Sequence, residues 1–406
     1  MRDFNMNILV IAQYFPPDMG GASTRIFNII KGIRNKNCRI YIITAFPHYP
    51  DAKNTSRYIK RPFLKQENKN VTIFRVWIPP ISHNRIVSRV ILHLMFIFTS
   101  LFVYPYINDI DIIYAANPNL FSFYSALLYS FLRNIPIVRN VDDLWPEVFY
   151  EMNIVKNNAL IRLFDSLSGL TYKLSKNITP ICNNYKKIII NKYKIDKNKI
   201  NVIEVGIDHV EKLTEKIRYD NNKPYNIIYS GILGAGYDFE FIIKVSSLIN
   251  NKNVKFYIRG IGPEYNKIIN LINKNKISNI ELDCKFISKQ QLKEYLEKAD
   301  AFILPMKENL SAVEGLSTKI FEYQSFGRPI ICISKGDAAE YIKKTRSGIV
   351  VNQDDYEGCI NAINYLYNNR ESADEMGKNG YTYLKNNLTS ELIGNKLYSI
   401  FSRYVN

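Results

Sequence analysis

The chain has 406 residues, enough for two or three domains of roughly 150 residues each. Hydrophobic residues make up 47% and charged residues 22%, which is ordinary globular usage and argues against a disordered, collagen-like or polytopic membrane protein. Lys and Arg number 54 against 37 Asp and Glu, so the net charge is +17. This excess favours an anionic partner, which would be nucleic acid, a phosphorylated substrate or an acidic lipid surface.

The cysteines and the N-terminus favour a reduced, cytoplasmic protein. The five cysteines are scattered without a Cys-x-x-Cys pair, which indicates isolated thiols rather than disulfides or a zinc site: Cys38, Cys182, Cys284, Cys332 and Cys359. The first apolar run, residues 7–13, has the length of a strand and no small-residue cleavage site follows it. We therefore expect no secretory signal.

Short apolar runs alternate with amphipathic helical stretches along the chain. The expected strands are residues 8–12, 39–44, 71–76, 110–115, 135–141, 178–182, 201–205, 226–230, 254–259, 280–286, 301–305, 329–334 and 348–351. Runs that are apolar on both faces predict a parallel sheet covered by helices, and a polar stretch at 209–223 divides them into two series. The prediction is an α/β protein with two Rossmann-like parallel-sheet domains facing each other across a cleft, where ligands bind at the carboxyl ends of the strands.

The domain limits follow from this division. We expect an N-terminal domain at 1–208, a linker at 209–224, a C-terminal domain at 225–385, and a last helix at 386–406 that packs back on the N-terminal domain.

The segment Val90–Tyr104 is nearly all apolar and marks a helix at about 86–107. It is either a helix packed in the core or a monotopic helix whose apolar face enters the bilayer, with Arg85 and Arg89 among anionic headgroups. The net charge of +17 favours membrane contact.

The most specific signal is the segment Val313–Pro329, which follows an expected strand that ends at Pro305. Ser317 or Thr318 can cap a helix that Gly327 and Pro329 terminate. A helix N-terminus binds a diphosphate well, and Lys319 adds a cation there.

Glu314 and Glu322 lie on either side of that helix start. Both can face one pocket, one towards a sugar and the other towards ribose hydroxyls, although Glu322 could also be an ordinary exposed helix residue.

Three further places can carry chemistry. Gly20 and Gly21 follow the first strand directly, and glycine allows close approach of a ligand to the backbone. The acids Asp142 and Asp143 follow the strand 135–141, and adjacent side chains on an extended backbone point to opposite sides, so we expect only one to reach the reacting centre. His48 is a third candidate in the cleft.

Taken together, these motifs resemble family 4 retaining glycosyltransferases of the GT-B fold. The sequence of the segment Ser317–Tyr323 is most similar to the corresponding segment in the branch that builds bacterial O-antigen and capsule polysaccharides, which includes fucosamine-transferase-like enzymes. The resemblance keeps its order along nearly the whole chain, through residues 7–25, 44–50, 114–118, 141–147, 205–208, 229–231 and 259–264. That branch also carries a membrane-associating helix where this chain has Val90–Tyr104.

The resemblance implies a metal-independent hexosyl- or N-acetylhexosaminyltransferase that needs no cofactor. It implies donor-binding residues that meet a nucleotide-diphosphate sugar, with UDP favoured: Ser230, Gly231, Arg259, Gly260, Glu314, Gly315, Leu316, Ser317, Thr318, Lys319 and Glu322. Gly20, Gly21 and Arg25 would form the acceptor or phosphate loop. Catalytic roles would fall to Asp142, Asp143 and His48, one aspartate orienting the acceptor hydroxyl or accepting its proton.

The partners implied are the donor, a polyprenyl-diphosphate-linked saccharide acceptor and the anionic inner face of the plasma membrane. No nucleic acid is expected, because no dense basic tract or recognisable binding module is present.

The chain departs from this family after Gly231. Many relatives carry an Arg and then a Lys there, whereas residues 232–237 contain no cation. A leaving diphosphate needs positive charge, so Lys319, Arg259 or Arg25 would have to supply it. The alternatives are a sugar-nucleotide epimerase of the same fold, or a non-catalytic assembly protein that binds nucleotide or membrane.

Overall fold

The computed structural model describes residues 4–49, 61–81, 86–116, 120–146, 158–208, 223–285, 287–307 and 316–405. The chain divides into two compact units. Unit 1 comprises Met1–Asp208 with Leu388–Asn406, and unit 2 comprises His209–Asn387.

Unit 1 is built on a seven-stranded sheet in the order β3-β4-β2-β1-β5-β6-β7. Its strands are β1 (Met6–Ile11), β2 (Cys38–Ala45), β3 (Phe63–Asn68), β4 (Val71–Val76), β5 (Ile112–Ala115), β6 (Ile137–Val141) and β7 (Asn177–Pro180). All neighbours pair in parallel except β3, which is antiparallel to β4 at the edge.

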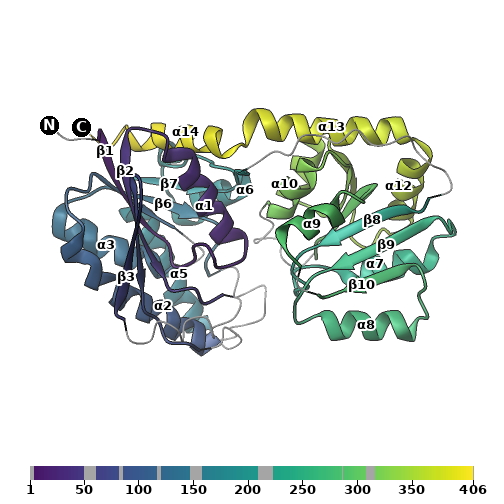
Figure 1. Cartoon of the computed structure of the whole chain (residues 1–406), viewed down its shortest axis with the longest axis horizontal. Coiled ribbons are helices and arrows are strands. Elements are labelled where there is room, and N and C mark those ends of the chain that lie inside the picture. Colours follow the sequence, from purple (N-terminus) through teal and green to yellow (C-terminus); the bar gives the residue numbers. More distant parts are fainter. Residues whose placement is uncertain are drawn as a thin grey trace. The chain divides into compact units, whose positions relative to one another are not determined.

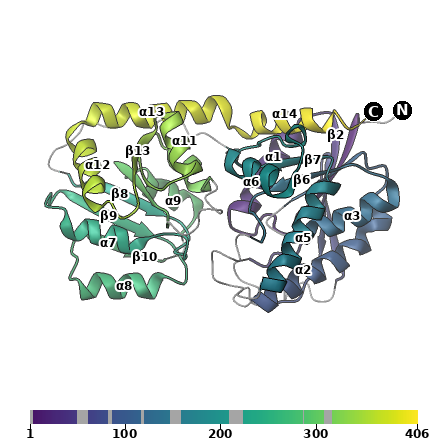
Figure 2. The same cartoon turned by 180° about the vertical axis from the view of Figure 1, so that it is seen from behind.

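The helices of unit 1 cover the sheet. They are α1 (Gly21–Ile33), α2 (Ile86–Ser100) with the 3₁₀ helix η2 (Leu101–Tyr106), α3 (Ser122–Arg133), α5 (Asn158–Leu174), α6 (Asn183–Tyr193), the 3₁₀ helix η3 (Lys197–Lys199) and α14 (Ser390–Phe401). Figure 2 shows α2, α3 and α5 side by side, and the hydroxyl of Tyr124 on α3 donates to the Leu167 carbonyl oxygen on α5 over 3.2 Å.

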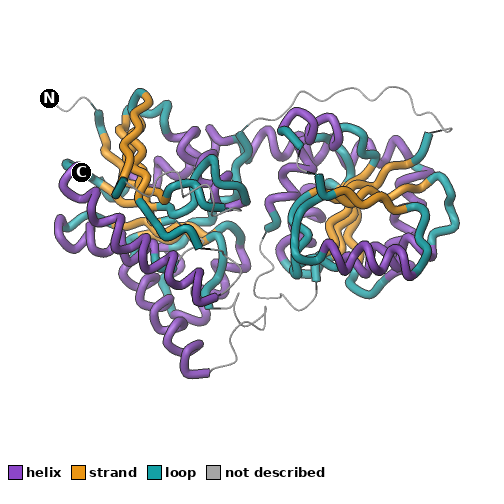
Figure 3. The backbone as a smooth tube through the Cα atoms, turned by 60° about the horizontal axis from the view of Figure 1, so that its bottom comes forward, coloured by secondary structure: helices purple, strands orange, loops and turns teal. Residues whose placement is uncertain are grey.

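Unit 2 is built on an all-parallel sheet in the order β10-β9-β8-β11-β12-β13. Its strands are β8 (Tyr225–Ser230), β9 (Val254–Arg259), β10 (Ile280–Asp283), β11 (Ala301–Pro305), β12 (Ile330–Ile333) and β13 (Gly348–Val351). Its helices are α7 (Phe239–Leu248), α8 (Tyr265–Lys274), α9 (Lys289–Leu296), α10 (Thr318–Ser325), α11 (Asp337–Thr345), α12 (Tyr356–Asn368) and α13 (Arg370–Asn387). Figure 3 shows helices and loops around the strands of each unit. The fold class predicted from the sequence, two parallel-sheet α/β domains, is confirmed.

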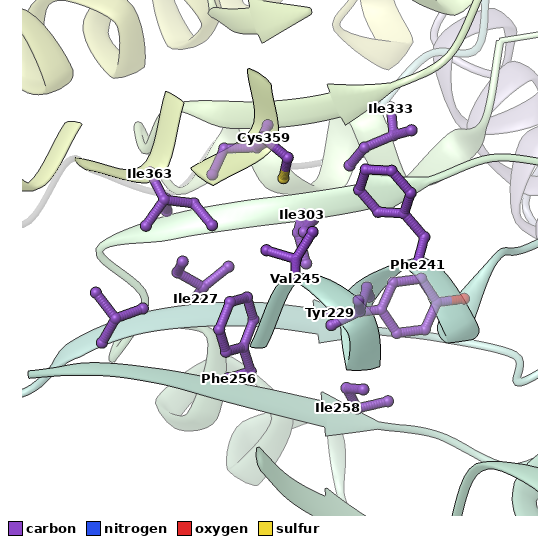
Figure 4. Packing of buried hydrophobic residues seen from close by; sticks show 14 of the residues in the cluster. Ile227, Tyr229, Phe241, Val245, Phe256, Ile258, Ile303, Ile333, Cys359 and Ile363 are labelled. Carbon is purple, nitrogen blue, oxygen red and sulfur yellow. The ribbon is translucent and has the colours of Figure 1, made fainter. Parts of the chain in front are cut away.

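The core of unit 2 lies between the sheet and the helices α7 and α12. Figure 4 shows Ile227, Phe256 and Ile303 from the strands packed against Val245 of α7 and Ile363 of α12. These side chains are almost completely buried, which is why the strands contain near-continuous apolar runs.

The helix α14 belongs to unit 1 although it ends the chain. In Figure 1 it lies beside α1, and the contact depends on Gly32 and Gly394. A Cβ atom on Gly32 would lie 1.8 Å from the Ser390 carbonyl oxygen, and one on Gly394 would lie 2.4 Å from the Gly32 carbonyl carbon. The two helices therefore meet backbone to backbone.

The structure differs from the predicted strands at two places. The edge strand β3 was not expected, because its residues Phe63–Asn68 are mostly polar and exposed rather than apolar. Residues 201–205 form no strand; they run extended beside β7, where the Asn201 and Ile203 amides donate to the Ile178 and Pro180 carbonyls over 3.0 and 2.9 Å.

The apolar helix α2 continues into η2, so that Val87–Tyr106 forms one helical segment of 20 residues with a mean hydropathy of 1.8, long and apolar enough to cross a membrane. One face packs into unit 1, where Leu92, Phe96 and Val103 are buried in the core. The opposite face stays exposed.

Candidate active site

The predicted site residues follow the carboxyl ends of the central strands in both units. In unit 2 the strand β8 lies between β9 and β11, and in unit 1 the strand β1 lies between β2 and β5, so the strand order reverses direction beside β8 and beside β1. A crevice opens at such a switch point in parallel sheets and is where ligands bind. The candidate donor residues lie at the first of these places and the candidate acceptor residues at the second.

The loops after β8 and β9 touch through their backbones. The Gly231 amide donates to the Arg259 carbonyl over 2.9 Å, and a Cβ atom on Gly260 would lie 1.7 Å from the Gly231 carbonyl oxygen. Tyr323 of α10 fixes the end of β8, because its hydroxyl accepts from the Ser230 amide (3.0 Å) and donates to the Ser230 carbonyl (3.1 Å). Ser230, Gly231 and Gly260 are thus brought together with α10.

The helix α10 begins and ends as the sequence predicts. Ser317 is its N-cap, with the side-chain oxygen accepting from the Lys319 amide over 3.4 Å, and Gly327 adopts a φ of 61° beyond the C-terminus. Leu316 is buried before the cap, whereas Thr318 is exposed in the first turn. Glu314 and Gly315 lie outside the described residues.

The side chain of Lys319 lies directly on Gly231. A Cβ atom on Gly231 would come 2.1 Å from Cε and 2.4 Å from Nζ of Lys319. The ammonium group donates to the Tyr237 hydroxyl over 3.2 Å and lies 4.7 Å from the centre of that ring. Within the part of the chain that the structure describes, Lys319 forms no ion pair, so its charge is available to an anion.

Glu322 and Arg259, the other charged residues predicted to bind the nucleotide-sugar donor that the structure describes, differ in their surroundings. Glu322 is half-buried on α10; burial raises the pKa of its carboxyl, and the charge of Lys319 opposes that shift. Arg259 is buried and forms an ion pair with Asp283, and its guanidinium also donates a hydrogen bond to the Lys285 carbonyl oxygen. The charge of Arg259 is therefore already offset, which leaves Lys319 as the better placed cation.

In unit 1, Arg25 is an internal cation rather than a surface one. It is 1% exposed, its Nε lies 3.0 Å from Asp142 Oδ1, and its Nη2 donates to Asn140 (2.9 Å) and to the Ile203 carbonyl (2.7 Å). The sequence predicts Arg25 in the acceptor or phosphate loop; in the structure its guanidinium lies inside unit 1, where its charge is paired with Asp142. Gly20 and Gly21 are the N-cap and first residue of α1.

The two aspartates follow the end of β6 in a bend and differ in the charges that surround them. Burial raises the pKa of Asp142, and Arg25 opposes the shift. For Asp143, burial and then the charge of Asp142 raise the pKa to about 7, with Arg25 acting in the opposite direction. A carboxyl that titrates near neutral pH is suited to accept a proton.

His48 is 1% exposed at the end of β2. Its Nδ1 lies 2.9 Å from the Phe46 carbonyl and 3.2 Å from Asp18 Oδ2, while Asp18 Oδ1 accepts from the His48 and Tyr49 amides over 2.7 and 2.9 Å. Sequence reasoning missed Asp18, although its place two residues before Gly20 in the loop after β1 was a usable signal.

Sequence reasoning also missed a polar residue on the apolar helix. His93 of α2 is 5% exposed, and its Nδ1 lies 2.8 Å from Gln13 Oε1, just after β1. Its ring lies 5.9 Å from the Phe121 ring and 6.2 Å from the Trp145 ring. These contacts connect α2 to the carboxyl end of the sheet, and the single histidine in an apolar helix was the signal for them.

The side chains offer no metal site among the described residues, since no group of three or more His, Cys, Asp or Glu side chains comes together there.

Comparison with known families identifies both units. The family model for glycosyltransferase family 4 matches residues 19–211, and the model for glycosyl transferases group 1 matches residues 211–383. The chain is therefore built from a family 4 glycosyltransferase domain followed by a group 1 glycosyltransferase domain.

Solved structures show that the fold is GT-B. Sucrose-phosphate synthase from Thermosynechococcus elongatus is similar over 98% of both chains, with a TM-score of 0.77 and 12% identity. Anabaena Alr3699/HepE, solved in complex with UDP-glucose, is similar over 98% of this chain and all of its own, with a TM-score of 0.69 and 14% identity.

A curated relative is the uncharacterized glycosyltransferase MJ1178 of Methanocaldococcus jannaschii, 25% identical over 173 residues. That match covers 40% of this chain and 48% of the relative, so the chain spans about half the length of the relative it matches.

Proposed function

We propose that the protein is a retaining glycosyltransferase that moves a hexosyl or N-acetylhexosaminyl group from a UDP-sugar to a lipid-linked saccharide acceptor. The role proposed is O-antigen or capsule polysaccharide biosynthesis. The proposal rests mainly on the position of the Lys319 ammonium group. This group lies against Gly231, beside the N-terminus of α10, at the switch point of the sheet of unit 2.

This arrangement suits a diphosphate. A helix N-terminus favours an anion, and a cation beside it adds charge-assisted hydrogen bonds. The loop after β8 has no cation of its own, but Gly231 leaves room for Lys319 to take that place. Lys319 would then stabilise the negative charge that develops on the leaving nucleoside diphosphate, without a metal ion.

The glutamates would hold the rest of the donor. Glu322 lies one turn along α10 from the Ser317 N-cap, and its carboxylate would accept from ribose hydroxyls. Glu314 would meet the sugar, as the family resemblance implies.

On the acceptor side, Asp143 is the stronger candidate to receive the acceptor proton. Asp142 is paired with Arg25. The pKa of Asp143 is raised to about 7, so at neutral pH its carboxyl can both accept and release a proton. His48, aligned by Asp18, would help to orient the acceptor.

A lipid-linked acceptor is supported by the two faces of α2. Its exposed face carries Val87, Ile91, Leu94 and Phe98 at helical spacing, while His93 reaches the end of β1. Leu128, Phe131 and Leu132 of the neighbouring α3 are also exposed, and neither helix contains an acidic residue. The apolar face would rest in the inner leaflet of the plasma membrane, with the protein on its cytoplasmic side.

A donor screen tests the proposal. We expect a UDP-sugar to raise the melting temperature of the full chain, equally with and without EDTA, because a ligand that binds only the folded state stabilises it. GDP- and TDP-sugars are the matched controls. No shift with any nucleotide sugar would contradict the donor assignment and favour the non-catalytic alternative.

A further inference from the structure

Unit 1 contains a second polar site that the proposed reaction does not use. It is an open cavity of about 380 Å³ between the first turn of α6, the extended residues 200–203 and one face of α14. We call it the α6–α14 cavity. All of its walls belong to unit 1, and none of the predicted donor or acceptor residues lines it.

The α6–α14 cavity is lined by three cations, Lys186, Lys396 and Arg403. No acidic side chain is among its described lining residues, and none of the three cations forms an ion pair within the described ranges. Like charges around one cavity repel one another, and an anion bound among them removes that repulsion. The charge therefore points to a negatively charged ligand.

The lining also supplies hydrogen-bond donors. Lys186 Nζ donates to the Ile200 carbonyl over 2.9 Å, which fixes the ammonium group at the wall while leaving it further hydrogens to donate. Asn183 lies in the first turn of α6, where the helix dipole is positive, and its side-chain amide is a neutral donor, whereas the Ser399 hydroxyl donates to the Lys396 carbonyl over 2.8 Å. Cations, a helix N-terminus and one neutral donor together match the several acceptor oxygens of a phosphate.

We infer that the α6–α14 cavity binds a phosphate-bearing anion, either a soluble phosphate or diphosphate or the headgroup of an anionic phospholipid. The site is separate from the one proposed for the donor, which lies in unit 2. Its occupation would attach α14, and with it the end of the chain, more firmly to α6.

Titration calorimetry with pyrophosphate tests this inference. All proteins carry Lys319→Gln, so that the proposed donor site contributes little, and the test variant adds Lys396→Gln with Arg403→Gln. The matched control adds Lys173→Gln with Lys187→Gln, two exposed lysines of α5 and α6 that do not line the cavity. We expect the test variant to bind pyrophosphate about tenfold more weakly or worse, since each cation offers charge-assisted hydrogen bonds, and the control to bind as the parent does.

Vesicles distinguish the two sources of the phosphate group. Binding to phosphatidylglycerol vesicles that only the test variant loses would assign a lipid headgroup, and unchanged vesicle binding with lost pyrophosphate binding would assign a soluble anion. Thermal melting checks that the variants remain folded. Equal affinity of the folded test and control variants for both probes would overturn the inference.

Discussion

The residue that most affects the proposed chemistry is Lys319. Its side chain crosses from α10 to the loop after β8 and is held by the Tyr237 hydroxyl and by the faces of Tyr237 and Tyr229, 4.7 and 5.6 Å from the ring centres. Aromatic faces attract a cation without neutralising it. The ammonium group is thus positioned and still able to pair with a phosphate.

A Gly231→Ala substitution tests this position. The new Cβ atom would overlap Cε and Nζ of Lys319, and φ at this residue is +148°, so the lysine must move and the loop is strained. We expect UDP-sugar affinity to fall about tenfold, which corresponds to about 1.4 kcal/mol. Gly234→Ala in the same loop is the matched control, because its Cβ would meet nothing closer than 3.5 Å. Equal affinities of the two variants, measured by calorimetry, would show that Lys319 does not depend on Gly231.

The raised pKa of Asp143 predicts a pH dependence of stability. An unfolded aspartate titrates near 3.9, whereas the folded one titrates at about 7, so between these values the folded state holds a proton that the unfolded state has lost. Stability is therefore greatest below the lower value and falls as pH rises through 7.

The variant Asp143→Asn should lack this fall. We expect wild type to lose about 1.3 kcal/mol relative to the variant between pH 5 and pH 8, half of what the pKa difference gives over this pH range, because the side chain is partly exposed. Urea unfolding followed by tryptophan fluorescence is suitable, since Trp77 and Trp145 both belong to unit 1. Asp109→Asn on the exposed surface is the control. Parallel pH profiles for wild type and Asp143→Asn would refute the raised pKa.

At the scale of elements, α2 combines a core face with an exposed apolar face. Burying a side chain such as Leu92 or Phe96 contributes roughly 1.5–3 kcal/mol each, so the helix is held on the sheet rather than free to cross a bilayer. The exposed face would enter only the boundary of the membrane, which is the monotopic alternative of the sequence-based hypothesis.

Introducing negative charge on the exposed apolar face of α2 tests the membrane proposal. Ile91→Glu with Phe98→Glu should release the protein from anionic vesicles in a sedimentation assay, because two charges cannot enter the apolar boundary cheaply. Leu248→Glu with Tyr365→Glu places the same charge on exposed apolar positions of unit 2 and should leave sedimentation unchanged. If the α2 variant still sediments as wild type does, this face is not the membrane contact.

For the whole molecule, the sequence predicts the parallel sheets well and the side-chain contacts poorly. Several strands have the expected bounds, for example Val71–Val76, Val254–Arg259 and Ala301–Pro305. Strands of a buried parallel sheet consist of near-continuous apolar runs, which are easy to recognise in a sequence. The edge strand β3 escaped this rule because its Lys65, Gln66 and Glu67 are exposed.

The candidate site shows the same division. The helix start at Ser317 and its end at Gly327 follow from local capping chemistry, which a sequence records. Lys319 contacts Gly231 across 88 positions of the sequence, and Arg25 pairs with Asp142 across 117 positions. A local sequence pattern cannot predict contacts between residues so far apart in the chain. These two contacts show that the charge of Lys319 is available to a ligand, whereas the charge of Arg25 is already paired with Asp142.

Binding of a nucleoside diphosphate by unit 2 through Lys319 underlies the whole proposed function. Calorimetric titration of UDP into wild type, Lys319→Gln and Lys289→Gln tests it most directly, the last being an exposed lysine of α9 that keeps the change in charge the same. We expect UDP to bind wild type and Lys289→Gln alike and to bind Lys319→Gln at least about tenfold more weakly. Equal affinity for all three proteins, or no binding of UDP to wild type, would contradict it.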